Sequence, residues 1–349
     1  MANNSILSIS PKKILVCQLR QIGDVILTTP AIQLLHEKFP QAKIYLYTEK
    51  KCAHLLEHNP HIYKIIPLDK KKLKNFWDEV KFYYQVAKHD FDLIIDFQQL
   101  PRSRFVALFS KAKIKLTYTP PWYNRLFYTH WTNSLPGYAV YSKLSILRLL
   151  GIQPQIIKPQ IYLTPEEIAW AKDYLTSLTA NQYQIITFDP THRRITRRWP
   201  TEHYALLGKL IGQKFPFTKI FLLYGPGEFE VAQKIYSSDP NVFILPQKIL
   251  SLREMAAIIH QASLHIGNCS APRHIAVALD TPSLIILGAT SSSWTYPDPK
   301  KHKDISLGLA CQPCNQNTCP HVNCLKQLTP EQVLSQSIDW IKTILTPSD

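Results

Sequence analysis

The chain has 349 residues, more than one average domain needs, and 45% of them are hydrophobic, which excludes an extensively disordered protein. Forty Lys and Arg against 25 Asp and Glu give a net charge of +15. No apolar run approaches the roughly 18 residues of a membrane span, and the N-terminus lacks a secretory apolar region, so we expect a cytoplasmic protein.

The positive charge is concentrated in the first half of the chain. Residues 1–160 carry 23 Lys and Arg against 10 Asp and Glu, whereas residues 161–349 carry 17 against 15. This asymmetry indicates an anionic partner for the N-terminal half: nucleic acid, an anionic membrane surface or a phosphorylated substrate. A basic surface that serves only solubility is the alternative.

Strands and helices alternate in the first half. Apolar runs rich in β-branched residues predict strands at residues 12–19, 43–49 and 92–98, with helices at 30–40 and 52–60. This alternation predicts a parallel sheet with both faces covered. Residues 117–141, dense in Tyr, Trp and Pro, show no clear period, and we interpret them as an active-site loop region.

A proline-rich linker separates two α/β regions. It spans residues 151–167, and Thr164 as N-cap and Pro165 at the first helical position predict that a helix begins there. Strand-like and helix-like segments then alternate again, and an amphipathic helix closes the chain. We predict an N-terminal Rossmann-like domain over residues 1–158, a C-terminal one over 159–330, and a C-terminal helix over 331–349.

One carboxylate stands out after the first predicted strand. Asp24 follows Gly23 in a polar turn, and ligands of open parallel sheets bind beyond the carboxyl ends of the strands. We therefore expect Asp24 to face a cleft between the two domains. The alternative is an ordinary helix N-terminal acid, favoured by the helix dipole. A lone Gly23 is no dinucleotide fingerprint, so no nicotinamide or flavin enzyme is implied.

Several stretches together resemble the lipopolysaccharide heptosyltransferases of glycosyltransferase family 9. The resemblance covers residues 12–335, and it rests on these segments in this order: "LRQIGDVILTTPAIQLLHEKFPQAKIYLYTE", "NPHIYKIIPLD", "FDLIIDFQQLPRSRFVALFSKAK", "RRWPTEHYALLGKLI", "LLYGPGEFE", "NCSAPRHIAVALDTPSLIILGAT" and "CQPCNQNTCPHVNCLKQLTPEQV". The variants "LTTP", "SAP" and "LGAT" look most like the heptosyltransferase III branch.

The resemblance implies a fold and a reaction. The fold is GT-B, with two Rossmann-like, doubly wound domains facing a central cleft, the N-terminal one binding the acceptor and the C-terminal one the nucleotide sugar. The reaction is an inverting transfer of heptose from ADP-L-glycero-D-manno-heptose to the inner core of lipopolysaccharide on the cytoplasmic face of the inner membrane. An anionic acceptor in an anionic leaflet agrees with the charge asymmetry.

The resemblance also suggests roles for individual residues. Asp24 aligns with the acid of the family's "GD" motif, which makes it the candidate general base. Arg197 stands where relatives commonly have Lys, and either residue can neutralise a departing diphosphate. Thr191 follows the "NP" or "HP" position of relatives, where backbone donors can reach phosphate. Glu228 corresponds to an acid that contacts the adenosine, although an ordinary helix-start acid is the alternative.

The sequence departs from the family in "GNCSAPRHIAVAL". Relatives have Asp-Ser-Gly-Pro or Asp-Ser-Ala-Pro here, whereas this chain has Cys269 at the Asp position. Ser270 as a cap and His274 still predict a helix N-terminus that suits a diphosphate. A thiol substitutes poorly for a carboxylate that holds sugar hydroxyls. Either Asn268 takes over that role, or the donor differs, or activity is reduced.

Four cysteines cluster near the C-terminus: Cys311, Cys314, Cys319 and Cys324. Their spacing is compact for a structural zinc site, so reduced thiols that pack a loop are favoured over a bound metal. The resemblance implies that the transfer requires no metal or other cofactor.

Other functions compete with this interpretation. The chain could use a different nucleotide sugar, or it could be a catalytically silent protein that binds core oligosaccharide. A nucleic-acid-binding protein with a zinc knuckle would explain the charge, including the four arginines among Arg193–Arg198, but it would not explain the ordered motifs. We therefore expect no nucleic-acid partner.

Overall fold

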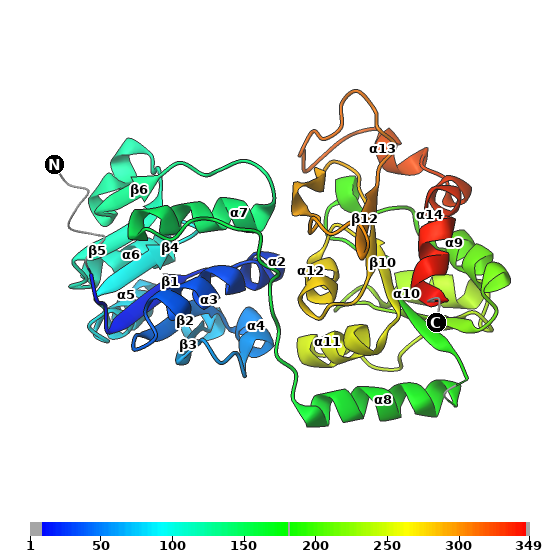
Figure 1. Cartoon of the computed structure of the whole chain (residues 1–349), viewed down its shortest axis with the longest axis horizontal. Coiled ribbons are helices and arrows are strands. Elements are labelled where there is room, and N and C mark those ends of the chain that lie inside the picture. Colours follow the sequence, from blue (N-terminus) through cyan, green and yellow to red (C-terminus); the bar gives the residue numbers. More distant parts are fainter. Residues whose placement is uncertain (1–8, 181, 347–349) are drawn as a thin grey trace. The chain divides into compact units, whose positions relative to one another are not determined.

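The computed structural model describes residues 9–180 and 182–346, and the chain separates into two compact units, residues 1–162 and 163–349. Each unit is built on a six-stranded parallel sheet with helices on both faces (Figure 1). The predicted pair of Rossmann-like α/β domains is therefore confirmed. Residues 1–8 and the last three residues of the predicted C-terminal helix lie outside the described part. Within the described part, no helix is both long enough and apolar enough to cross a membrane.

The first unit has the strand order β3-β2-β1-β4-β5-β6. Its strands are β1 (Lys13–Cys17), β2 (Lys43–Glu49), β3 (Lys64–Leu68), β4 (Leu93–Asp96), β5 (Ile114–Tyr118) and β6 (His130–Thr132). Cys17 pairs in register with Tyr47 of β2 and with Asp96 of β4, so the carboxyl ends of these strands lie at one edge. The strand order reverses beside β1, where open sheets of this kind bind ligands.

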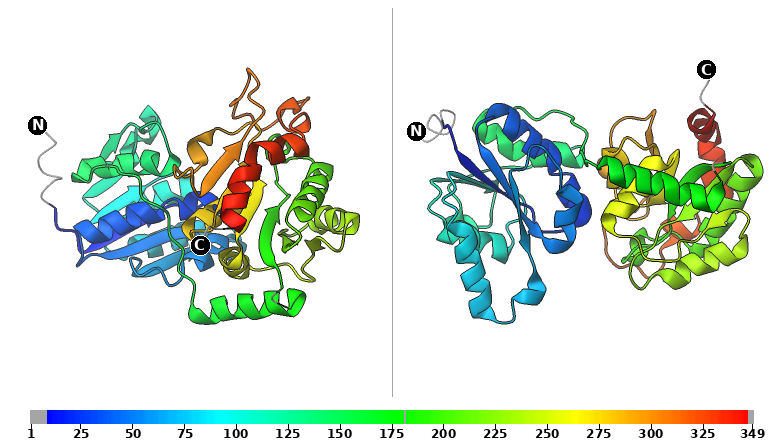
Figure 2. Two further views of the ribbon diagram at one scale, coloured as in Figure 1. Left: turned by 45° about the vertical axis from the view of Figure 1, so that its right-hand side comes forward. Right: turned by 90° about the horizontal axis from the view of Figure 1, so that it is seen from below.

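The helices of the first unit cover both faces of this sheet. They are α2 (Ile22–Ile26), α3 (Thr29–Lys38), α4 (Lys50–Ala53), α5 (Phe76–Ala87), α6 (Pro101–Phe109) and α7 (Ala139–Leu144), with 3-10 turns η1 (His54–Leu56), η2 (Lys70–Lys72), η3 (Trp122–Phe127) and η4 (Ser145–Leu150). Helix α3 packs against α7, and α5 packs against α6 (Figure 2). Apolar strand residues such as Leu15, Tyr47 and Ile94 form the core beneath α5 and α6.

The region that we interpreted as an irregular loop contains regular structure. Between residues 117 and 141 the chain completes β5, forms the turn η3 and the short strand β6, and begins α7. These elements were not predicted, because the aromatic residues of this region follow neither a helical nor a strand-like period. Helix α7 matters for the site, since it carries a buried lysine.

The second unit has the strand order β12-β11-β10-β7-β8-β9, which is the same doubly wound order with β7 in the place of β1. Its strands are β7 (Gln184–Asp189), β8 (Thr218–Leu222), β9 (Phe243–Ile244), β10 (Leu264–Asn268), β11 (Ser283–Ile286) and β12 (His302–Ile305). In register, Gly267 of β10 pairs with Asp189 of β7. The loops that follow these two central strands therefore start side by side.

The helices of the second unit are α8 (Pro165–Thr179), α9 (Thr201–Lys214), α10 (Phe229–Ser238), α11 (Leu252–Gln261), α12 (Ala271–Ala278), α13 (Asn323–Lys326) and α14 (Pro330–Leu345), with turns η5 (Ile195–Arg197) and η6 (Ser292–Trp294). The predicted start of α8 is confirmed, because Thr164 and Glu167 form a capping box. Helix α14 packs on α9, and Ile341 lies in the same apolar core as Trp199. The predicted C-terminal helix is thus part of the second unit.

Candidate functional site

Asp24 lies in the first turn of α2, just beyond the carboxyl end of β1. Its side chain is 27% exposed, and its Oδ1 atom lies 3.4 Å from Nζ of Lys143. Among the described residues, no hydrogen-bond partner occupies Oδ2. Asp24 therefore has a specific charged partner, which an acid that only complements a helix dipole does not require.

Lys143 is the charged partner of Asp24, and the sequence did not reveal it. It comes from α7, its side chain is 8% exposed, and its ammonium donates a hydrogen bond of 2.9 Å to Oε1 of Gln18. Burial lowers the pKa of Lys143, and the Asp24 carboxylate opposes that shift. A buried ammonium is costly without an opposite charge, and Asp24 supplies that charge.

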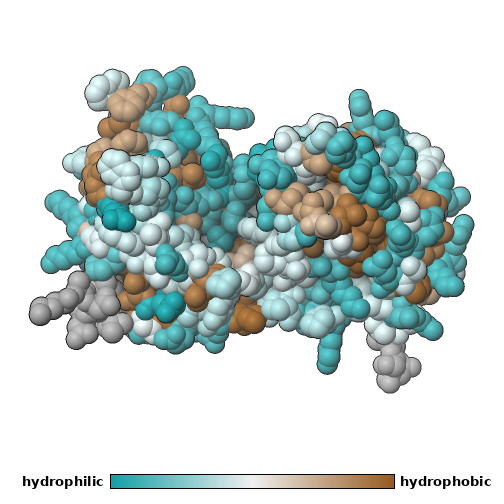
Figure 3. Space-filling model, turned by 90° about the horizontal axis from the view of Figure 1, so that it is seen from above, coloured by the Kyte–Doolittle hydropathy of each residue, from teal (hydrophilic) through white to brown (hydrophobic). Residues whose placement is uncertain are grey.

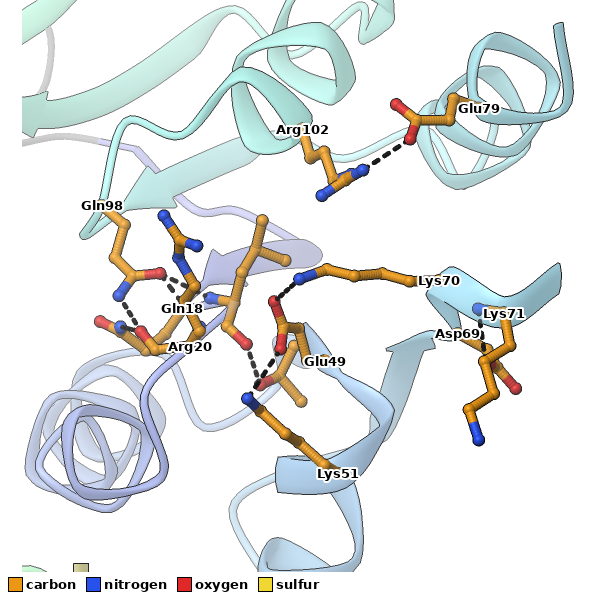
Figure 4. Close-up of polar contacts among 12 residues, drawn as sticks. Gln18, Arg20, Glu49, Lys51, Asp69, Lys70, Lys71, Glu79, Gln98 and Arg102 are labelled. Carbon is orange, nitrogen blue, oxygen red and sulfur yellow. Dashed lines mark hydrogen bonds and ion pairs between the residues drawn. The ribbon is translucent and has the colours of Figure 1, made fainter. Parts of the chain in front are cut away.

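A separate cavity of about 250 Å³ lies at the carboxyl ends of β1 and β2, and Leu19, Arg20 and Glu49 contribute to its lining. Figure 4 shows charged side chains around it: Lys70 and Lys51 both contact Glu49, and Arg102 contacts Glu79 at 2.6 Å. Burial raises the pKa of Glu49, but hydrogen bonds from the two lysines outweigh it, and the pKa lies below its ordinary value. Donors and acceptors of both charges line the cavity, which suits a hydroxyl-rich ligand group.

Four polar side chains of the second unit lie near the ends of β7, β8 and β10. Oγ1 of Thr191 donates to Oε2 of Glu228 at 2.7 Å, and the backbone N–H of Gly225 donates to the same oxygen at 2.8 Å. The hydroxyl of Ser270 donates to Oδ2 of Asp189. The structure therefore brings together Thr191, Glu228 and Ser270 and adds Asp189.

Glu228 and Ser270 occupy helix N-cap positions without capping through their side chains. Glu228 precedes α10 and Ser270 precedes α12, and neither side chain accepts a hydrogen bond from the first turn of its helix. Ser270 is the N-cap residue of α12, as predicted, but its hydroxyl donates to Asp189 and does not cap the helix. The first-turn N–H groups of α12 thus have no side-chain acceptor at the N-cap.

Asp189 is the most perturbed carboxyl group of this site. It is 4% exposed at the end of β7. Burial raises its pKa to about 7; the hydrogen bond from Ser270 lowers it, and the nearby Glu228 raises it further. A buried carboxyl group with such a shifted pKa is typical of functional sites.

Arg197 ends the turn η5, upstream of the buried Trp199. Its side chain is half-buried, and its Nε atom is buried with no hydrogen-bond partner among residues 9–180 and 182–346. Burial lowers the pKa of the neighbouring His192 to about 4, with Arg197 contributing in the same direction, so the imidazole is neutral at pH 7. Arg197 therefore supplies positive charge here and His192 does not.

Cys269 does not stand in for a carboxylate. Its side chain packs with Ile285, Leu287 and Trp294, and Nη1 of the buried Arg273 donates to its Sγ at 3.2 Å. His274 lies one residue further along α12, also buried, with its ring 6.1 Å from that of Trp294.

Asn268 cannot replace the missing acid either. Its Nδ2 donates to the carbonyl oxygens of Asp189 and Thr191, and its Oδ1 accepts from the N–H of Trp199 at 2.9 Å. The side chain is fully buried and holds the loop after β7 in place. The hypothesis that Asn268 takes over the sugar contact is therefore wrong.

The four clustered cysteines are all free thiols: Cys311, Cys314, Cys319 and Cys324. Burial raises the pKa of Cys324, and charge on the other three would raise it further, so the sulfurs lie near one another. Within the part of the chain that the structure describes, no three His, Cys, Asp or Glu side chains are arranged to hold a metal ion. That these thiols are reduced and hold no metal stays a prediction.

Comparison with known proteins identifies the chemistry. Residues 80–324 match the family model described as Glycosyltransferase family 9 (heptosyltransferase). The chain is 26% identical to lipopolysaccharide heptosyltransferase 1 of Campylobacter coli, over 80% of this chain and 85% of the relative. It is also 26% identical to lipopolysaccharide heptosyltransferase 3 of Escherichia coli, over 79% and 83%. These equal identities leave the heptosyltransferase III branch a prediction.

A solved structure shares the fold. Escherichia coli heptosyltransferase WaaC with ADP-2-deoxy-2-fluoro heptose has a TM-score of 0.70 at 21% identity, covering 94% of this chain and 99% of WaaC. Because the matched residues 80–324 make up more than half of the chain, the protein belongs to glycosyltransferase family 9, the heptosyltransferases, and is a glycosyltransferase.

Proposed function

We propose that the protein transfers heptose from ADP-L-glycero-D-manno-heptose to the inner core of lipopolysaccharide, with inversion at the anomeric carbon, on the cytoplasmic face of the inner membrane. The names of the relatives support the acceptor class, and the fluoro-heptose nucleotide bound to WaaC supports the donor class. The observation that carries the mechanism is the Asp24 carboxylate beside the buried Lys143.

Asp24 acts as the general base. Its Oδ2 atom takes the proton of an acceptor hydroxyl while that oxygen bonds to the anomeric carbon of heptose. The bond from the anomeric carbon to the β-phosphate oxygen breaks, and ADP leaves with the electron pair. A single displacement of this kind inverts the anomeric configuration.

Lys143 positions that base. The ammonium contacts Oδ1 and is itself fixed by Gln18, so Oδ2 keeps one orientation toward the acceptor. Gln18 also donates through Nε2 to the carbonyl oxygen of Arg20 at 2.9 Å, which ties the pair to the turn beside the cavity. A displacement of about 1 Å in such a group can reduce a rate about 10²-fold.

The departing diphosphate binds at Arg197 and the N-terminus of α12. Among the described residues, the buried Nε of Arg197 has no hydrogen-bond partner, and a guanidinium fork suits phosphate oxygens. The N-cap side chain of α12 accepts no hydrogen bond from its first turn, whose N–H groups form the positive end of the helix dipole. Backbone donors near Thr191 and the buried His274 complete this binding region.

Glu228 binds the ribose of the donor. Thr191 and Gly225 hold its Oε2, and no hydrogen-bond partner occupies Oε1 among the described residues. A fixed carboxylate with a free oxygen can accept from ribose hydroxyls.

Asp189 supplies the sugar-binding carboxylate that Cys269 lacks. In the family pattern the acid stands at position 269 and Asn or His at position 189, whereas this chain has the acid at position 189. The two positions are close, because Asp189 accepts from the hydroxyl of Ser270, the neighbour of Cys269.

A different nucleotide sugar is the second candidate donor, and the apolar surroundings of Cys269 are the observation that favours it. The test is transfer to lipopolysaccharide inner-core acceptors with ADP-heptose and with UDP-hexoses, followed by mass spectrometry and NMR of the new linkage. We expect one added heptose with inverted configuration. Product from UDP-hexose alone would favour the second donor, and no product from any donor would favour a silent binding protein.

A further inference from the structure

Three neighbouring elements of the first unit expose aromatic and aliphatic side chains. Trp77 on α5 is 74% exposed and Trp122 on η3 is 80% exposed. We call this set the aromatic face: Trp77, Tyr84, Phe105, Leu108, Trp122 and Leu126. Apolar side chains reach the surface elsewhere too, among mainly hydrophilic ones (Figure 3). This set is distinct because its members come from adjoining elements.

The aromatic face is continuous across these elements. Helix α5 packs against α6, and α6 contacts η3. The ring of Phe109 on α6 lies 6.3 Å from those of Tyr84 and Phe105, which joins α5 to α6. Arg104 of α6 hydrogen-bonds Asn124 of η3, and its guanidinium lies 5.4 Å from the ring of Phe127. The exposed rings therefore stand on a fixed support.

Lysines alternate with the exposed rings along α5. Trp77, Lys81, Tyr84 and Lys88 recur at helical spacing and lie on one exposed side. Nζ of Lys88 lies 4.9 Å from the ring of Tyr84. The two acids of α5 are engaged, since Asp78 accepts from the N–H of Lys74 and Glu79 pairs with Arg102. The sequence has no Asp or Glu between residues 97 and 165, which includes α6 and η3.

We propose that the aromatic face docks the first unit on an anionic lipid bilayer. Trp and Tyr rings favour the boundary between headgroups and acyl chains, and lysines among them attract anionic lipids. A second copy of the chain fits less well, because two faces of the same positive charge would repel each other. This inference rests on the proposed function, whose acceptor is embedded in such a membrane.

The lysines that we expect to contact the membrane are not those of the densest basic run in the sequence. The run Lys70–Lys72 is the densest basic stretch of the first half, but Lys70 pairs with Glu49 at the cavity. Lys81 and Lys88 lie among the exposed rings and make no ion pair with a described residue. We therefore expect substitutions on the aromatic face to weaken membrane binding more than charge reversal at residues 70–72.

The test compares two variants of the full chain on vesicles. The face variant carries Trp77→Ser, Tyr84→Ser, Trp122→Ser and Leu126→Ser. The control carries Leu178→Ser, Leu206→Ser, Phe217→Ser and Ile249→Ser, which are exposed apolar residues of the second unit. Co-sedimentation with vesicles of phosphatidylglycerol and phosphatidylcholine should show at least about tenfold weaker binding for the face variant and unchanged binding for the control.

Two further readouts keep the outcomes distinct. Native tryptophan fluorescence should be quenched by brominated lipids, and the face variant should lose that quenching. Equal vesicle binding by native protein and face variant would overturn the proposal, as would self-association in lipid-free sedimentation that only the face variant lacks. If native protein binds vesicles as expected but transfers no heptose, the proposed function fails while the docking surface stands.

Discussion

The two units use the same sheet topology to present carboxyl groups in opposite electrostatic settings. In the first unit, Asp24 follows the central strand β1 and contacts the buried ammonium of Lys143. In the second unit, Asp189 ends the central strand β7 and is held by the hydroxyl of Ser270, with Glu228 nearby and no ion pair of its own among the described residues. One carboxylate is paired with a cation, whereas the other is buried among neutral donors.

The difference comes from the elements that supply the partners of the two carboxyl groups. Lys143 reaches Asp24 from α7, and Ser270 reaches Asp189 from the turn between β10 and α12. A carboxylate fixed by a cation suits a base that must keep one orientation. A carboxyl group held by a hydroxyl, with its pKa raised to about 7, suits a partner for sugar hydroxyls. The central strands place both carboxyl groups, and the partners from α7 and from the turn after β10 distinguish their surroundings.

The largest effect is expected for Asp24→Asn. Loss of the general base should lower kcat about 10²- to 10⁴-fold, while the affinity for ADP-heptose stays close to that of the native protein. Asp78→Asn is the matched control, because Asp78 is likewise a first-turn acid of a helix in the same unit. Calorimetric titration and steady-state kinetics separate the two quantities. A loss of donor affinity in Asp24→Asn would contradict an acceptor-side role.

Lys143→Met should have the next largest effect. Met fills the buried space without the charge, and the unfixed Asp24 should lower kcat about 10²-fold with little change in the KM for the donor. Lys115→Met is the control, since Lys115 is another partly buried lysine of the first unit that contacts a carbonyl oxygen instead of a carboxylate. Partial rescue of Lys143→Ala by added alkylamines would support a positioning role. Equal losses in both Met variants would mean that the role is only structural.

Asp189→Asn tests whether the sugar-binding carboxylate has moved. We expect affinity for ADP-heptose to fall about tenfold while affinity for ADP changes little, because each hydrogen bond to a charged group contributes about 1.5–3 kcal/mol. Adding Cys269→Asp to this variant should restore part of the affinity, since Arg273 already lies beside that position. If the double variant binds no better and Asp189→Asn binds ADP-heptose normally, the carboxylate has not been exchanged.

The pH dependence of stability provides the smallest but most specific contrast. The folded pKa of Asp189 is about 7 against an ordinary value of 3.8, so between these values the folded state binds the proton and the unfolded state does not. The free energy of unfolding therefore falls as the pH rises from about 4 toward 7, by up to about 1.4 kcal/mol per pH unit. The unfolding midpoint of Asp189→Asn relative to native protein should rise from pH 4 to pH 8. A constant difference would contradict the raised pKa.

Much of the fold could be predicted because its signals are local. The segments that form β1, β2 and β4 are continuous apolar runs, and Thr164 and Pro165 mark the start of α8. Asp24 could be found because it follows a recognisable buried strand.

The features of the candidate site that could not be predicted depend on contacts between residues far apart in the sequence. Lys143 meets Gln18 across 125 residues and lies beside an aromatic region without a period, so no local pattern marks it. Asp189 lies at the end of a predictable strand, but only the structure brings it to Ser270. The expectation for Asn268 failed because backbone partners already occupy its amide.

The most direct test of the account is calorimetric titration of the native protein with ADP-heptose, ADP and UDP. We predict that ADP-heptose binds at least about tenfold more tightly than ADP, a difference of about 1.4 kcal/mol, because we propose that Asp189 supplies a carboxylate to the sugar. UDP should bind more weakly than ADP. If ADP-heptose and ADP bind alike, or if UDP binds most tightly, the proposed donor and the role of Asp189 are both contradicted.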